Sequence, residues 1–223
     1  DPSGRDDTRP RLSPEQVKAN AQHYQEQFGK IVDLSLTEVR WQSEWYRDFP
    51  LEKVFDLASR FTLAQLLAHE TFRKRYDEGL PLSLLELLYP LLQAYDSVAV
   101  QADVEFGGTD QKFNNLVGRD LQASLGMPPQ QVFLVPLIPG TDGQKMGKSA
   151  GNTIDILSPP EDMYGKIMSM ADEVMPVYFE TLTDVPEEEL AEFRRGMEAG
   201  ALNPMQVKQR LAREIVAQFH DAQ

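Results

Sequence analysis

The stretch from Ser83 to Gln111 reads S-L-L-E-L-L-Y-P-L-L-Q-A-Y-D-S-V-A-V-Q-A-D-V-E-F-G-G-T-D-Q, and the rest of the chain is interpreted from it. Its first half is almost all apolar, apart from Tyr89, Gln93 and Asp96, which follow one another at spacings of four and three residues. On a helix these three side chains share one face. Burying an amide or a carboxylate without a partner costs about 2 kcal/mol or more, so this face should be hydrogen-bonded, either to a ligand or to neighbouring backbone groups.

The second half of the stretch predicts a strand, a tight turn and a second helix. A short apolar run from Val104 leads into Gly107-Gly108, and Thr109 or Asp110 can cap a helix that continues to about Ser124. Glycines at such a junction let a ligand approach the backbone and the helix N-terminus, although many glycine pairs only form tight turns. The acidic Asp110 favours a ribose hydroxyl or an amine over a phosphate.

A glycine-rich loop, G-T-D-G-Q-K-M-G-K-S-A-G-N at 140–152, follows a second predicted strand at 132–137. Lys145 and Lys148 lie three residues apart in it. Two lysines in a loop of this composition suit a mobile arm that brings positive charge to a polyphosphate. An ordinary solvated surface loop is the alternative.

Helix signals occupy most of the remaining chain. The segment 34–46 is ambiguous, with an alternation typical of a half-buried strand. The methionines at 163, 168, 170 and 175 indicate core packing. Capping signals predict helix starts at Ser13, Thr62, Ser83, Ser158, Asp184 and Asn203. A further helix, without a capping signal, is predicted at 51–61, and Pro90 should bend the helix that contains it. The first helix carries an apolar stripe of Val17, Ala21, Tyr24, Phe28 and Ile31.

Composition narrows the function classes. The 223 residues include no Cys and three His, which excludes disulfides and thiolate metal sites and disfavours a histidine zinc site, so no metal site is predicted. A net charge of −13 argues against polyanion binding by the whole surface. No apolar run reaches the length of a membrane span, and we expect a cytoplasmic protein without a membrane partner.

Four motifs together resemble one family, the bacterial tyrosyl-tRNA synthetases, which are class I aminoacyl-tRNA synthetases. The motifs are D-P-S-G at 1–4, L-L-Q-A-Y-D at 91–96, G-G-T-D-Q at 107–111 and K-M-G-K-S at 145–149, and their order and spacing also fit. The last is similar to the family's K-M-S-K-S loop with Gly147 in place of Ser, which keeps both lysines and should alter loop flexibility only.

The resemblance implies a tyrosine–tRNA ligase that joins tyrosine to ATP as tyrosyl-adenylate, releases pyrophosphate, and passes tyrosine to the 3′ end of tRNA(Tyr). ATP is then a substrate, accompanied by Mg²⁺. The implied tyrosine site comprises Tyr89, Gln93 and Asp1 for the amino group, Asp96 for the phenolic hydroxyl and Gln111 for the carboxylate. The implied ATP site comprises Gly108 and Asp110 at the ribose, Met146, and the catalytic cations Lys145, Lys148, Arg5 and Arg9 at the phosphates.

The implied fold is α/β: a partial Rossmann-like catalytic domain at 1–157, with a helical insertion at about 34–81 that would carry a homodimer contact, and a small all-α domain at 158–223. The family's H-I-G-H signature would precede Asp1 and its RNA-binding domain would follow Gln223, so we expect an incomplete copy that can be inactive alone. Three alternatives stay open: a tryptophanyl relative, which the stripe on 89–96 disfavours because indole has one donor, a non-catalytic RNA-binding remnant, and an α/β nucleotide-binding module indifferent to tyrosine.

Overall fold

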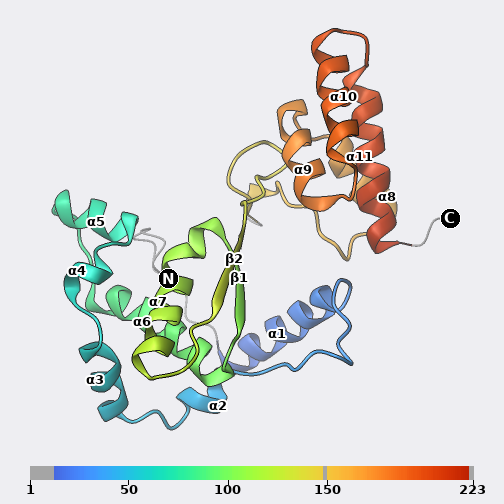
Figure 1. Ribbon diagram of the computed structural model, residues 1–223. Helices are drawn as coiled ribbons and strands as arrows, with labels where there is room; N and C mark the ends of the chain where they lie inside the picture. The colour runs from blue at the N-terminus through green and yellow to red at the C-terminus, as the bar shows by residue number, and fades with distance from the viewer. Residues whose placement is uncertain (1–12, 148–149, 221–223) are drawn as a thin grey trace. The chain divides into compact units, whose positions relative to one another are not determined.

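The computed structural model describes residues 13–147 and 150–220 (Figure 1). These residues form two compact units. Residues 38–137 make up the first unit, and the second joins residues 13–37 to residues 138–147 and 150–220. The domain limits expected from the sequence, at 157 and 158, stay a prediction.

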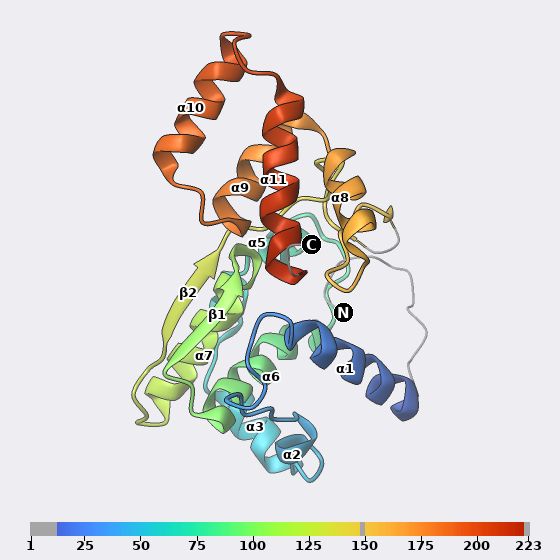
Figure 2. The ribbon, with the colours of Figure 1, turned by 90° about the vertical axis from the view of Figure 1, so that its right-hand side faces the viewer.

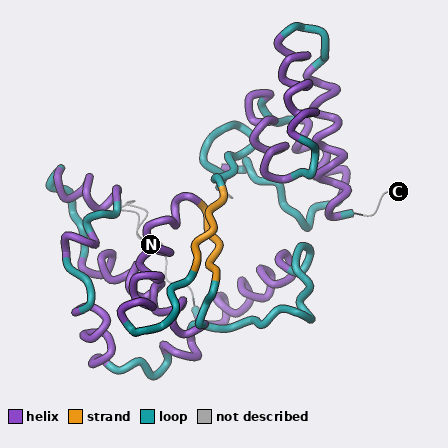
Figure 3. Tube along the Cα trace, viewed as in Figure 1, coloured by secondary structure: helices purple, strands orange, loops and turns teal. Residues whose placement is uncertain are grey.

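The first unit is an α/β unit in which two parallel strands pair next to α7 (Figure 3). The strands align Val104 with Gln131 and Gly108 with Val135, and α7 lies between them in sequence, as a parallel connection requires. The elements are α2 (Ser43–Tyr46), α3 (Leu51–Ser59), α4 (Leu63–Leu66), α5 (Glu70–Asp77), α6 (Leu84–Val100), β1 (Val104–Gly108), η1 (Thr109–Gln111), α7 (Lys112–Ser124) and β2 (Gln131–Val135).

The core of this unit lies between α6 and α7. Leu91 and Ala94 of α6 pack with Val117 and Leu121 of α7, all four nearly inaccessible to solvent, and Leu57 joins them from α3. The predicted capping box of α6 is present, because the Ser83 side chain accepts the Glu86 N–H and the Glu86 side chain returns to Ser83. The helix continues through Pro90.

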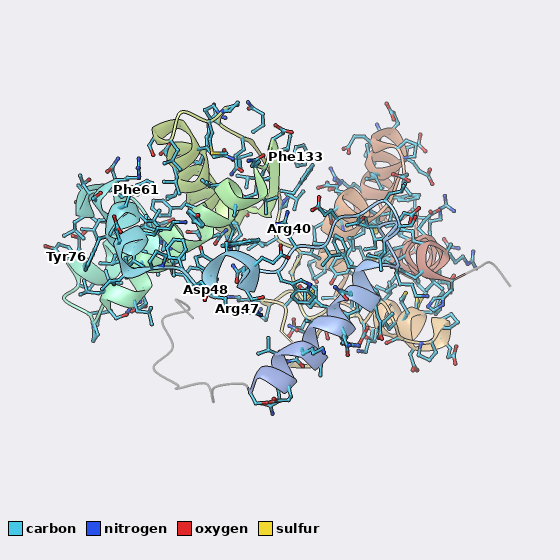
Figure 4. All side chains as sticks on the ribbon, turned by 90° about the horizontal axis from the view of Figure 1, so that it is seen from below. Arg40, Arg47, Asp48, Phe61, Tyr76 and Phe133 are labelled. Atoms are coloured by element: carbon cyan, nitrogen blue, oxygen red, sulfur yellow. The ribbon has the colours of Figure 1, made fainter. Side chains whose placement is uncertain are left out.

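The two strands turn different side chains to their two faces. Glu105 and Val132 are partly buried, whereas Phe106 and Phe133 are 71% and 55% exposed. The two phenylalanine rings contact each other in a tilted arrangement, with centroids 5.2 Å apart. Figure 4 labels Phe133 on its strand. Parallel sheets are normally covered on both faces, whereas residues 38–137 leave the Phe106 and Phe133 face of this sheet exposed.

The second unit is all-α, apart from its loops (Figure 2). Its core joins Met163, Met170 and Met175 to Tyr178 and Leu211, each at most 2% exposed, which confirms the core role predicted for these three methionines. The elements are α1 (Pro14–Phe28), α8 (Pro160–Met168), η3 (Asp172–Val174), α9 (Met175–Leu182), α10 (Glu187–Glu198) and α11 (Pro204–Phe219).

Several local predictions are wrong. Residues 34–42 form no strand; a turn at 34–35 and an irregular segment at 37–41 lead into α2. The helix predicted from Thr62 divides into α4 and α5, although its Thr62–Gln65 capping box is present. The apolar stripe predicted for the first helix extends too far, because α1 ends at Phe28 and Ile31 lies beyond it. Tyr24 and Ile31 are 73% and 69% exposed.

Helix starts were predicted better than the side chains that cap them. Helices α8 and α10 begin near the predicted prolines, but their N-cap residues are Pro159 and Pro186, and neither Ser158 nor Asp184 provides a cap bond. A side-chain cap is likewise absent at η1 and α7, so Thr109 and Asp110 do not act as predicted. No helix in the described parts of the chain is long and apolar enough to cross a membrane.

Candidate functional site

The three residues predicted on the polar face of α6, Tyr89, Gln93 and Asp96, have different surroundings. Asp96 is partly buried and faces α2, Gln93 is partly buried and faces η1 and α7, and Tyr89 is 46% exposed. Figure 4 labels Arg47 and Asp48, which mark the end of the α2 segment. The face is therefore not uniformly buried.

Asp96 is held by two side chains from the α2 segment. Gln42 Nε2 donates to Asp96 Oδ2 at 2.5 Å, and Trp45 Nε1 donates to Asp96 Oδ1 at 2.9 Å. A carboxylate has about four lone-pair positions. Asp96 therefore keeps acceptor capacity for a further donor such as a phenolic hydroxyl.

Burial sets the protonation behaviour of this corner. Burial raises the pKa of Asp96, and its hydrogen-bonding neighbours Gln42, Trp45 and Tyr46 reverse this only in part. The pKa of Tyr46 is also raised, first by burial and then by the nearby Asp96 charge, so Tyr46 stays a neutral phenol that donates to the Leu92 carbonyl oxygen. Phe49 and Tyr95 close the corner, with ring centroids 4.9 Å apart.

Gln93 and Gln111 meet through a third amide that the sequence did not point to. Asn114, 8% exposed on α7, donates from Nδ2 to Gln93 Oε1 at 3.0 Å and to Gln111 Oε1 at 3.3 Å. Gln93 Nε2 lies 3.5 Å from Gln111 Oε1. The structure thus brings two of the predicted tyrosine ligands together, and the spacing of three between Gln111 and Asn114 was the signal that could have revealed it.

The glycine pair is required by close packing. A Cβ on Gly107 would lie 2.7 Å from Asn115 Nδ2, and one on Gly108 would lie 2.6 Å from Asp110 Oδ1. Asp110 itself is exposed and accepts a 3.2 Å bond from Gln111 Nε2. Only glycine fits both positions without moving these polar groups.

A buried polar network supports this junction from behind. Ser97 Oγ and Gln130 Nε2 both donate to Glu105 Oε2, the first at 3.0 Å. Asn115 is satisfied in the orientation in which its amide nitrogen donates to Glu105 Oε1 and to the Gln111 carbonyl oxygen, both at 3.2 Å. Gln111 is therefore anchored through its backbone as well as through its side chain.

The lysine loop belongs to the second unit. Lys145 is exposed and pairs with Pro139 in an isolated antiparallel bridge, and Tyr178 Oη donates to the Pro139 carbonyl oxygen at 2.8 Å. Met146 lines an apolar cavity of about 210 Å³ together with Ile138 and Ile154 among others. Four predicted site residues, Asp1, Arg5, Arg9 and Lys148, lie outside the described residues.

The described residues contain no group of three or more His, Cys, Asp or Glu side chains placed to hold a metal ion. The polar groups of the candidate site in the described residues are amides, phenols, the carboxylates of Asp96 and Asp110, and the Lys145 ammonium group. Such groups recognise and orient a ligand by hydrogen bonds and charge.

Comparison with known proteins gives curated relatives at high identity. The chain is 59% identical over 223 residues to the tyrosine–tRNA ligase of Dehalococcoides mccartyi, which covers all of this chain and 56% of the relative. It is 52% identical over 221 residues to that of Thermotoga maritima, which covers 99% of this chain and 55% of the relative. The chain thus spans somewhat more than half the length of these relatives.

Solved structures support the fold. A tyrosyl-tRNA synthetase from Archaeoglobus fulgidus, complexed with L-tyrosine, matches with a TM-score of 0.71 at 22% identity over 93% of this chain and 73% of that one. A tryptophanyl-tRNA synthetase from Aeropyrum pernix matches with a TM-score of 0.70 at 20% identity over 93% and 64%. The family model described as tRNA synthetases class I (W and Y) matches residues 1–223. This chain therefore belongs to the class I tRNA synthetases of the tryptophan and tyrosine type.

Proposed function

We propose that this chain is the tyrosine-recognising and adenylate-forming part of a tyrosine–tRNA ligase. The observation that carries the proposal is the carboxylate of Asp96, partly buried on α6 and oriented by Gln42 and Trp45 with acceptor capacity to spare. A phenolic hydroxyl satisfies that capacity, and a phenyl ring does not. The 59% identity to a curated tyrosine–tRNA ligase supports the same substrate.

The amino acid would be held at both ends. Asp96 accepts the phenolic hydroxyl, Tyr89 and Gln93 hold the amino group with the help of Asp1, and Gln111 lies at the carboxylate. The contact of Asn114 with both Gln93 and Gln111 supports this grouping, because one amide holds the two glutamines together.

ATP would supply the adenylyl group that activates tyrosine. Gly108 and Asp110 lie at the ribose, Met146 at the nucleotide, and Lys145, Lys148, Arg5 and Arg9 at the phosphates. The tyrosine carboxylate oxygen attacks the α-phosphorus, the bond to the bridging oxygen of the leaving group breaks, and pyrophosphate departs with its charge neutralised by the lysines and arginines. Magnesium enters with ATP, whose phosphates bind it. The catalytic power of such a site comes from positioning and charge stabilisation.

The second half of the reaction passes the tyrosyl group to the 3′-terminal adenosine of tRNA(Tyr), with adenosine monophosphate as the leaving group. Because translation takes place in the cytoplasm, this function accords with the location expected from the sequence. RNA contacts would be local, since the chain carries a net charge of −13.

A homodimer is part of the proposal. The insertion at 34–81 exposes large apolar side chains, with Leu51 and Phe55 of α3 each 65% exposed and Tyr76 of α5 57% exposed. Figure 4 labels Tyr76 and Phe61 in this region. Exposed apolar side chains in one region are typical of a protein–protein interface, and a symmetric copy of the same surface could cover it.

The test is exchange of labelled pyrophosphate into ATP. A hybrid is made in which this chain replaces the matching part of the Dehalococcoides mccartyi ligase, and it is assayed with tyrosine, phenylalanine and tryptophan. We expect exchange with tyrosine alone, and loss of about 100-fold or more in Lys148→Ala, because a charge on the leaving group is no longer neutralised. Exchange with tryptophan instead, or none from a folded hybrid, would overturn the proposal.

A further inference from the structure

Asn152, at the end of the lysine loop, is 4% exposed and is bonded to both halves of that loop. Its Nδ2 donates to Asp142 Oδ1 at 2.8 Å and to the Lys145 carbonyl oxygen at 3.2 Å. Its Oδ1 accepts the Gly147 N–H at 2.9 Å. One buried amide thus contacts three residues that lie five to ten positions earlier in the chain.

The backbone around Asn152 adds to this arrangement. The Asn152 carbonyl oxygen accepts the Thr141 N–H at 3.0 Å, and the Thr141 carbonyl oxygen accepts the Ala171 N–H at 3.0 Å, which ties the loop to the helical core. A Cβ on Gly140 would lie 2.2 Å from Asn152 Nδ2, so glycine at this position is needed for the amide to fit. The loop is built around this side chain.

Asp142 completes the cluster. Its Oδ1 accepts the Gln144 N–H at 3.0 Å as well as the Asn152 amide, and these bonds keep the pKa of its carboxyl below the usual range. The Asn152 amide is therefore fully used: both protons are donated and its oxygen accepts. A buried amide whose bonds are all made holds one orientation, because turning it over would place donors against donors and acceptors against acceptors.

We propose that Asn152 is the positioning residue of the lysine loop, which fixes the backbone on both sides of Met146 so that the Lys145 ammonium projects from a set direction toward the phosphates of bound ATP. The inference rests on the proposed function for the identity of the ligand. The role follows from chemistry: Asn152 holds the Lys145 carbonyl oxygen and the Gly147 N–H, and a lysine on a fixed backbone has fewer conformations to lose when the phosphates arrive.

The test uses a pair of substitutions that rebuilds one bond in reverse. Asn152→Asp removes both donated bonds and sets a second carboxylate beside Asp142. Adding Asp142→Asn gives that carboxylate an amide donor and keeps the acceptor for Gly147, but it gives up the acceptor for the Gln144 N–H, because Asp142 Oδ1 accepts both bonds. The matched control is Asn203→Ala, which removes the N-cap bond to the Met205 N–H of α11 in the same unit and leaves the loop untouched.

Two readouts are taken. Hydrogen exchange of the Gly147 and Thr141 amides is measured in the 223-residue chain, and pyrophosphate exchange kinetics are measured in the hybrid. Asn152→Asp keeps an oxygen that can accept the Gly147 N–H, but it places a carboxylate against the Asp142 carboxylate and the Lys145 carbonyl oxygen. Because these groups repel it, the residue 152 side chain should leave its place, with loss of protection at Gly147 and a fall of about 10-fold or more in the rate constant for exchange, and with the KM for tyrosine unchanged. The double variant should recover part of the protection and part of the rate, because it removes the repulsion between the two carboxylates but restores no donor to the Lys145 carbonyl oxygen. The cap control should neither lose protection nor slow exchange.

Two results would overturn the inference: unchanged Gly147 protection in Asn152→Asp, or lost protection with kinetics no different from those of Asn203→Ala. In a Lys145→Ala background, Asn152→Asp should add little, because a residue that acts through Lys145 has no effect without it. If the effects of Asn152→Asp and Lys145→Ala on exchange were fully additive, that result would also overturn the inference. If the parent hybrid showed no pyrophosphate exchange, the proposed function would be overturned. The hydrogen exchange of Gly147 would then test only whether Asn152 holds the loop backbone.

Discussion

The corner around Asp96 shows how single residues set the properties of the candidate site. Two donors, Gln42 and Trp45, orient a carboxylate whose pKa is raised by burial. The carboxylate must be charged to accept a phenolic hydroxyl well, so its protonation and its orientation both affect binding. The residues that provide the orientation lie 54 and 51 positions away in the sequence.

Trp45→Phe removes the indole donor and keeps an aromatic ring. With one fewer hydrogen bond to the charged form, the pKa of Asp96 rises further, and tyrosine affinity should fall about 5- to 10-fold near neutral pH. Because the protonated form accumulates as pH falls, the loss should begin at a higher pH than in the parent. Calorimetric titration with tyrosine between pH 5 and 8 measures both the fall in affinity near neutral pH and the pH at which binding begins to weaken.

The chain offers a matched control, since its other tryptophan, Trp41, is 45% exposed. Trp41→Phe should leave the titration unchanged. Equal behaviour of the two variants would show that Trp45 does not orient Asp96 for the ligand.

Gly147 is the one departure from the K-M-S-K-S pattern. It has no positive φ, and no atom lies within 4 Å of where its Cβ would be. Gly147→Ser should therefore keep its N–H bond to Asn152 and retain pyrophosphate exchange in the hybrid within about 2-fold, with a slightly less flexible loop. A large loss of exchange would mean that the loop needs the conformational freedom of glycine.

At the scale of the elements, α6 ends in a strained residue. Its C-cap, Gln101, has φ 57° and ψ 46°, the left-handed conformation that costs most residues about 1 kcal/mol relative to glycine. Gln101→Gly should raise the free energy of unfolding by about 0.5–1 kcal/mol and the melting temperature by about 2 °C. Thermal denaturation followed by circular dichroism tests this, with Gln101→Ala as the control that should gain nothing.

The start of α6 predicts a pH dependence. Arg75 lies 2.5 Å from Glu86, and this partner, with the Ser83 N–H, lowers the pKa of Glu86 from 4.5 to about 2. A carboxyl with a depressed folded-state pKa stabilises the fold above its unfolded pKa of 4.5 and loses that contribution as pH falls toward 2. With allowance for solvent screening, about 1–2 kcal/mol should disappear between pH 5 and pH 2.

Glu86→Gln keeps the capping geometry and removes the charge. Its stability near neutral pH should be lower than that of the parent, and the difference should shrink as pH is lowered through this window. Denaturant unfolding at pH 7, 4 and 2.5 measures it. A difference that stays constant with pH would show that the Arg75 pair does not depend on the Glu86 charge.

At the scale of the whole molecule, the sequence predicted what is local. The capping boxes at Ser13, Thr62 and Ser83 and the cap at Asn203 are all present, because each involves residues two or three positions apart. The motifs around 91–111 and 145–149 also indicated the family that the comparisons show. Not every local signal is realised, because Ser158 and Asp184 form no cap bond at the starts of α8 and α10.

What the sequence missed depends on contacts between distant segments. The alternation at 37–41 indicated a strand, but no partner strand lies beside it, and the segment instead delivers Gln42 and Trp45 to Asp96. The apolar stripe of α1 indicated burial, yet Tyr24 and Ile31 are exposed in this unit. Periodicity reports which face of an element is apolar, and it does not report what covers that face.

The measurement that tests the central claim most directly is the ratio of tyrosine to phenylalanine affinity, determined by titration calorimetry on the hybrid and on its Asp96→Asn variant. If Asp96 reads the phenolic hydroxyl, the parent should prefer tyrosine by at least about 10-fold, since phenylalanine leaves a partly buried carboxylate unpaired, and the variant should lose most of that preference. Equal affinities in the parent, or a preference that Asp96→Asn leaves intact, would contradict the account.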